Sequence, residues 1–147
     1  MVEIERKFLV NREKWNAIEK PAPQRIVQGY LSKSDQLVSR VRLKGEKAYL
    51  TIKGSNTGIT RAEFEYEIPV QEAEELLRLF CPKKIVKNRY KVKFGLHIWE
   101  VDDFTEPFPA LLLAEIELKS EDEDFECPEW VEKEVSEDPK YFNSNMI

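Results

Sequence analysis

Hydrophobic and polar residues alternate along most of this chain. The most regular stretch runs from Thr60 to Val70, where charged residues take the odd positions from Arg61 to Glu67 and apolar residues take the even ones. A period of two indicates a β-strand whose two faces meet different surroundings. The same pattern predicts eight strands, over Met1–Val10, Arg25–Lys33, Leu37–Lys44, Lys47–Lys53, Thr60–Val70, Lys83–Phe94, Leu96–Asp103 and Leu111–Lys119.

Shorter stretches change to the period of a helix. An apolar stripe at helical spacing predicts a helix over Gln71–Phe80, closed by Pro82. Asn11 is a suitable N-cap for a second helix over Arg12–Lys20, and Ser136–Pro139 resembles a third helix start. The strands are joined mainly by short turns. We therefore expect a mainly β (α+β) fold, an eight-stranded closed antiparallel barrel with a few flanking helices, as one domain over residues 1–147.

Composition narrows the possible chemistry. The net charge of −5 argues against a nucleic-acid binder driven by bulk electrostatics, and no apolar run is long enough to span a membrane. The amino terminus has no signal-peptide segment, so we expect a cytoplasmic protein. Cys81 and Cys127 lack metal-ligand spacing, and His97 is the only histidine. Most zinc sites and histidine-assisted nucleophiles are thereby disfavoured, which leaves carboxylates, Lys, Arg and Tyr as reactive groups.

The charged faces of the strands divide by sign. Like charges two residues apart on a strand repel, unless an ion of opposite charge lies between them. Carboxylates and water suit Mg²⁺ or Mn²⁺, and Arg and Lys suit phosphate. A barrel with these faces inside would be a metal-assisted phosphate site with its apolar faces turned outward under the helices; a sandwich with its charged faces in water is the alternative. The basic set is Arg40, Arg42, Lys44, Lys53, Lys87 and Arg89, and the acidic set is Glu3, Glu5, Glu63, Glu65, Glu100, Asp102, Glu115 and Glu117.

The order of several short motifs resembles the CYTH superfamily, the triphosphate tunnel metalloenzymes, and most closely its small bacterial inorganic triphosphatases. Each motif alone is weak, but the ordered set covers essentially the whole chain. The motifs are Glu3-x-Glu5-x-Lys7, Gln28-Gly29-Tyr30-Leu31, Arg40-x-Arg42, Thr51-x-Lys53, Arg61-x-Glu63-x-Glu65, Lys87-x-Arg89-Tyr90, Glu100-x-Asp102, Glu115-x-Glu117 and Glu134-Val135-Ser136-Glu137-Asp138.

The resemblance implies a charged tunnel that hydrolyses a triphosphate, most simply inorganic tripolyphosphate, with two divalent cations, Mg²⁺ or Mn²⁺. It implies that the carboxy-terminal segment around Lys140 and Tyr141 plugs one tunnel end. It also assigns roles to residues. Phosphate would be bound by Lys7, Arg40, Arg42, Lys53, Lys87 and Arg89; metal would be held by Glu3, Glu5, Glu63, Glu65, Asp102, Glu115 and Glu117; and catalysis would rest on Lys7, Tyr30, Arg40 and Arg42, with Lys7 and Tyr30 as a dyad.

Other functions within reach of this residue set stay open. A class IV-type adenylate cyclase is one, although the His-Phe pair that precedes the first acidic motif in family cyclases is absent here. A thiamine triphosphatase is another, and a non-catalytic polyphosphate- or nucleotide-binding module is a third. We expect a small triphosphate as the partner, tripolyphosphate or possibly ATP, with no nucleic acid and no membrane, and a homodimer is possible.

Overall fold

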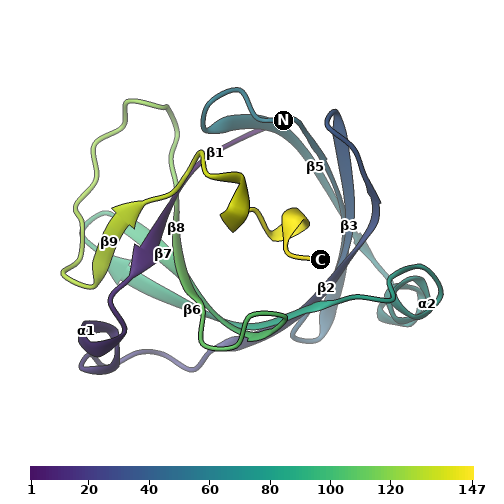
Figure 1. Ribbon diagram of the computed structural model, residues 1–147, viewed down its shortest axis with the longest axis horizontal. Coiled ribbons are helices and arrows are strands. Elements are labelled where there is room, and N and C mark those ends of the chain that lie inside the picture. The colour runs from purple at the N-terminus through teal and green to yellow at the C-terminus, as the bar shows by residue number, and fades with distance from the viewer.

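Eight antiparallel strands close into a barrel in the computed structural model, which describes residues 1–147 (Figure 1). Around the ring the order is β5-β4-β3-β2-β6-β7-β8-β1, and a β1–β5 pairing closes it. The predicted barrel is confirmed. Neither of its α-helices is long and apolar enough to cross a membrane. The strands are β1 (Val2–Val10), β2 (Gln24–Lys33), β3 (Leu37–Lys44), β4 (Lys47–Gly54), β5 (Thr60–Ile68), β6 (Ile85–Phe94), β7 (His97–Glu106) and β8 (Leu112–Glu117), and the helices are α1 (Arg12–Asn16) and α2 (Val70–Phe80).

One edge of β1 is shared by two partners. Near its start β1 pairs with β5, with Glu3 opposite Arg61, and near its end it pairs with a ninth strand, β9 (Val131–Glu134). The sequence analysis missed β9, because four residues after an acidic loop are too short for an alternation to stand out. It also made the first helix too long, since α1 ends at Asn16 rather than at Lys20. The other boundaries differ by three residues or fewer.

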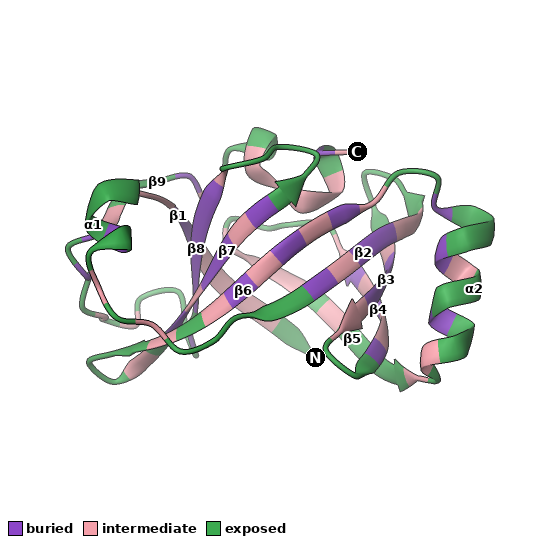
Figure 2. Ribbon diagram, turned by 90° about the horizontal axis from the view of Figure 1, so that it is seen from below, coloured by how far each residue is buried: buried purple, intermediate pink, exposed green.

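The apolar faces of the strands point outward, and the helices cover part of them; Phe64 and Tyr66 of β5 stay exposed. Trp15 of α1 packs with Trp99 and Trp130 in one cluster, and Ala73 and Leu77 of α2 pack against the other side of the barrel in a second cluster. Figure 2 shows α1 and α2 at opposite ends of the molecule, outside the sheet. The charged faces are thereby left to point inward. The sandwich alternative, with its charges in water, is wrong.

A third apolar cluster fills one end of the lumen. Ile85, Phe104 and Leu113 point inward from β6, β7 and β8 and meet Val135 and Met146 of the carboxy-terminal segment. This segment turns into the ring of strands, where two short 3₁₀ helices, η1 (Pro139–Tyr141) and η2 (Asn143–Asn145), lie (Figure 1). The helix start expected at Ser136–Pro139 is therefore a 3₁₀ turn, capped by Asp138. The lumen is therefore closed at one end and has the shape of a cup, whose floor is this apolar cluster.

The contact of α2 with the barrel leaves no room for a side chain at Gly29. A Cβ there would lie 2.6 Å from the Cβ and 2.8 Å from the Sγ of Cys81, which ends α2. We expect Gly29→Ala to lower the free energy of unfolding by about 1–3 kcal/mol, the usual cost of overpacking. Urea unfolding measures it. Gly54→Ala is the matched control, because a Cβ at Gly54 would lie 3.6 Å from the Cβ of Ala62, an ordinary contact.

Candidate active site

The inward-facing charges line a single deep cavity. Only 4 of its 23 lining residues are hydrophobic, so it suits a highly charged ligand rather than an apolar one. All but one of the residues predicted for the site are among the lining residues; the exception is Asp102. The predicted lining residues are Glu3, Glu5, Lys7, Tyr30, Arg40, Arg42, Lys53, Glu63, Glu65, Lys87, Arg89, Glu115 and Glu117.

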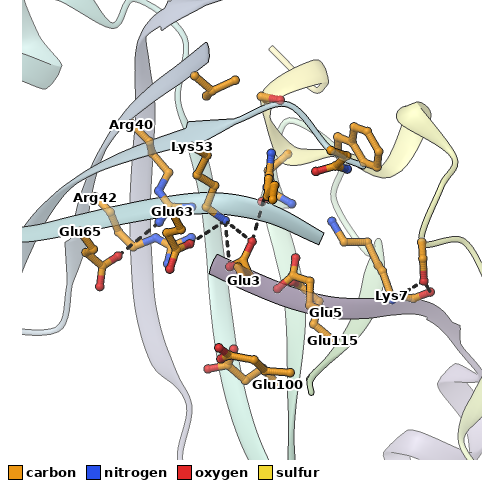
Figure 3. Close-up of a pocket in the computed structure, with 18 of the residues that line it drawn as sticks. Glu3, Glu5, Lys7, Arg40, Arg42, Lys53, Glu63, Glu65, Glu100 and Glu115 are labelled. Atoms are coloured by element: carbon orange, nitrogen blue, oxygen red, sulfur yellow. Dashed lines mark hydrogen bonds and ion pairs between the residues drawn. The ribbon is translucent and has the colours of Figure 1, made fainter. Parts of the chain in front are cut away.

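Several cations in the cavity are paired with carboxylates from other strands. Lys53 Nζ lies 3.1 Å from both Glu3 Oε1 and Glu63 Oε2, an arrangement that Figure 3 shows. Arg40 donates a hydrogen bond of 3.1 Å to Thr51 Oγ1, and its Nη2 is 3.6 Å from Glu65. The Lys53–Glu63 pair follows from the register of adjacent strands, whereas Lys53–Glu3 and Arg40–Glu65 each reach across one intervening strand.

Asp102 lies behind two of the cations rather than in the cavity. Its carboxylate oxygens accept hydrogen bonds from Arg89 Nε at 2.8 Å and Nη2 at 2.9 Å, and Lys87 Nζ is 2.8 Å away. Burial alone would raise the pKa of Asp102, but Arg89 and Lys87 outweigh it and hold that pKa below its ordinary value. Burial lowers the pKa of Lys87 to about 7 despite Asp102. With both oxygens engaged, Asp102 is placed to orient two bases, and a metal role for it stays a prediction.

Three cations that line the cavity, Lys7, Arg42 and Lys44, have no carboxylate in ion-pair contact. Arg42 is bound only by the neutral side chain of Gln28, and Lys7 Nζ donates to the backbone carbonyl of Tyr141 at 2.9 Å. Burial, together with the charges of Arg40 and Arg89, lowers the pKa of Arg42 to about 9. The cavity therefore holds positive charge that the protein itself does not neutralise.

The cations of β3 and β6 form a basic wall of the cavity. The carboxylates of β1 and β8 form an acidic wall. Glu5 and Glu115 lie side by side and share a hydrogen bond, and burial with the charges of Glu115 and Glu3 raises the pKa of Glu5 well above its ordinary value (Figure 3). Burial and the nearby Glu3 and Glu100 also raise the pKa of Glu117. No three carboxylates converge closely enough to enclose a metal ion by themselves. Oxygen donors with unbalanced negative charge nonetheless match what Mg²⁺ or Mn²⁺ requires.

Some lining residues escaped the sequence analysis. Ser136, Phe142, Asn143 and Ser144 reach the cavity from the carboxy-terminal segment, and no charge or periodicity in that segment signals it. Gln28 belongs to the Gln28-Gly29-Tyr30-Leu31 motif but was given no role, and its side chain accepts hydrogen bonds from Arg42. The predicted Lys7–Tyr30 dyad is not joined by a hydrogen bond here, since Tyr30 Oη accepts from Gln28 and Lys7 reaches Tyr141. Both side chains nevertheless line the same cavity.

Known proteins are similar to this chain in sequence and fold over nearly its full length. An inorganic triphosphatase of Acetivibrio thermocellus is 44% identical over 146 residues, covering 99% of this chain and 92% of that protein. One of Nitrosomonas europaea is 36% identical over 150 residues, covering 99% and 97%. The crystal structure of an inorganic triphosphatase superposes with a TM-score of 0.67 at 31% identity, covering 98% of this chain and 93% of that one. The family model of the CYTH domain matches residues 1–144, and the chain belongs to the CYTH family.

Proposed function

We propose that the protein hydrolyses inorganic tripolyphosphate with the help of Mg²⁺ or Mn²⁺. The observation that carries this is the cup itself: Arg42, which has no carboxylate within ion-pair distance, lines the same cavity as Glu5 and Glu117, whose pKa values are raised by burial and by nearby acids. Such a site matches a polyanion on one side and divalent cations on the other. The curated relatives, which are inorganic triphosphatases at 44% and 36% identity, support the same reaction.

The basic wall would bind and orient the phosphates. Arg40 and Arg42 lie on one face of β3, two residues apart, and their planar guanidinium groups can each contact two phosphate oxygens. Lys87 and Arg89 lie beside them on β6. We assign to Arg42 the stabilisation of charge on the transferring phosphoryl group, because no carboxylate competes for it. The floor of the cup limits how far a phosphate chain can enter.

The acidic wall would hold the metal. We assign ligand roles to the carboxylates that line the cavity, Glu3, Glu5, Glu63, Glu65, Glu115 and Glu117. We leave out Asp102, which does not line the cavity and is held by Arg89 and Lys87. When bound, a divalent cation neutralises phosphate oxygens and lowers the pKa of a water ligand. Since no three carboxylates converge here, one or two carboxylates would serve each cation, and phosphate and water oxygens would complete its shell.

Assays with three triphosphates test this function. With Mg²⁺ or Mn²⁺ we expect phosphate release from tripolyphosphate to exceed release from ATP and from thiamine triphosphate. Cyclic AMP formed without free phosphate would instead identify a cyclase, and binding of tripolyphosphate without turnover would identify a binding module.

Removal of the metal should abolish this hydrolysis. Without a cation the phosphate oxygens are not neutralised and the attacking water is not activated, so we expect activity to fall to background in EDTA and to return when Mg²⁺ or Mn²⁺ is added in excess. Phosphate release measured before and after the chelator provides the check. Full activity in EDTA would contradict the assignment of the carboxylates to metal.

A further inference from the structure

Gln28 is a neutral side chain that holds a cation of the basic wall, Arg42, by two hydrogen bonds. It lies on β2 and is fully buried. Its Oε1 accepts from Arg42 Nε at 2.9 Å and from Arg42 Nη2 at 2.7 Å. Its Nε2 donates to Tyr30 Oη at 3.1 Å and to Asn143 Oδ1 at 3.3 Å. All of the amide's principal polar positions are therefore used, and its orientation is fixed by its partners.

The other buried guanidinium groups of the cavity are held differently. Arg89 is bound by the carboxylate of Asp102, and Arg40 has Glu65 at 3.6 Å. A carboxylate fixes a guanidinium in place but also cancels its charge. An amide oxygen offers the same acceptor geometry to Nε and Nη2 and leaves the charge intact. At the position of Arg42, orientation is thus provided without neutralisation.

We propose that Gln28 is a positioning residue that holds Arg42 as a fixed, un-neutralised cation for the triphosphate. Its Nε2 also holds the hydroxyl of Tyr30 in the same cavity. This inference rests on the proposed function. It explains why a glutamine, rather than a glutamate, faces an arginine in a barrel where the neighbouring bases are paired with acids. A ligand polyanion would supply the missing counter-charge.

Gln28→Glu separates positioning from a purely structural role. The new carboxylate keeps both acceptor bonds to Arg42, and the Tyr30 hydroxyl can turn to donate to it, while Asn143 Oδ1 keeps its bond of 2.8 Å from Lys87 Nζ. A structural role therefore predicts a fully active protein. Our inference predicts a melting temperature equal to or above that of the wild type, together with weaker binding of tripolyphosphate, because Arg42 has lost its net charge to an internal partner.

The experiment compares kcat and KM for tripolyphosphate with Mg²⁺, and metal-free tripolyphosphate binding by calorimetry, in matched variants. For Gln28→Glu we expect KM and Kd to rise roughly 10- to 100-fold, the range of one hydrogen-bonded charge. Gln28→Met removes the bonds without adding charge, so it should lower kcat and weaken binding less than Gln28→Glu does. Gln71→Glu adds the same charge on the exposed surface of α2 and should behave as the wild type.

Three results would overturn the inference. Wild-type KM and Kd in Gln28→Glu would do so, as would equal weakening of binding in Gln28→Met, or a Gln28→Glu protein that fails to fold. In each case hydrolysis by the wild-type protein would leave the proposed function standing. A wild-type protein that hydrolyses no triphosphate would contradict the function instead, so the two failures are distinguishable.

Discussion

Replacement of Asp102 by alanine is expected to lower the free energy of unfolding by about 3–5 kcal/mol, the cost of removing one partner from a buried ion pair. Asp102 is 1% exposed, and it binds the almost equally buried Lys87 and Arg89. Without its carboxylate these two cations, with Arg42 nearby, would stay in the barrel with too little opposing charge. Lys87 would respond by losing its proton, but Arg89 would keep its charge.

Urea unfolding, followed by tryptophan fluorescence, measures this effect, and Asp103→Ala is the matched control. Asp103 is the next residue of β7, and it pairs with Arg12 at 3.5 Å with both side chains partly exposed. An exposed pair of this kind contributes about 0–1 kcal/mol. Equal losses in the two variants would contradict the role given to Asp102.

The effect of Asp102 also has a defined pH dependence. Because folding lowers its pKa below the ordinary value of 3.8, its contribution to stability is present above that pH. The contribution is lost as the pH falls through the lowered pKa. Lys87 has a pKa of about 7 and loses its proton more readily without Asp102. The difference between wild type and Asp102→Ala should therefore grow as the pH falls through 7 and shrink only in strong acid.

The barrel and the contents of its lumen could be predicted because the sequence repeats one pattern many times. Pairs such as Glu3 and Glu5, or Arg40 and Arg42, place like charges two residues apart, which is unfavourable without opposite charge nearby. Strand register then supplies that charge, as where Lys53 meets Glu63. Alternation and sign together were enough to indicate an inward charged face, and the ordered motifs indicated the family.

The features that sequence reasoning missed depend on contacts between distant residues. The resemblance implied that the carboxy-terminal segment plugs one tunnel end, but no pattern showed that Val135 and Met146 anchor it there by apolar packing, because those residues look ordinary in sequence. Asp102 has the same pattern as the acids that line the cavity, yet it is sequestered by its neighbours on β6. Gln28 carries no charge, so a survey of charges passes over it.

Replacement of Glu5 by glutamine is expected to stabilise the protein and to remove its activity. Burial, Glu115 and Glu3 raise the pKa of Glu5 well above its ordinary value, so the charged form is unfavourable in the folded protein. A glutamine amide can donate to Glu115 as the protonated acid does, and it carries no charge. We expect a gain of about 1 kcal/mol, or roughly 2–4 °C in Tm. We also expect kcat to fall by roughly 10²-fold or more, because a metal ligand is lost.

The pH dependence of the gain follows from the sign of the shift. Folding raises the pKa of Glu5, so the wild-type protein loses stability as the pH rises from the ordinary value of 4.5 through the raised pKa. Glu5→Gln lacks this loss. The difference in Tm between the two proteins, measured by thermal unfolding in metal-free buffer, should be small below pH 4.5 and grow toward alkaline pH.

Glu115→Gln is the matched comparison, because it makes the same chemical change one hydrogen bond away. Burial opposes the ionisation of Glu115, but Lys7, the bond from Glu5 and Arg89 lower its pKa well below the ordinary value. Its charge balances those cations, so its loss should destabilise the protein while activity falls as it does in Glu5→Gln. A lower Tm in Glu5→Gln would contradict the unfavourable charge assigned to Glu5. Full hydrolysis in Glu5→Gln would contradict its role as a metal ligand. If Glu5→Gln gains stability and loses activity, the carboxylate of Glu5 serves to bind a ligand rather than to stabilise the fold.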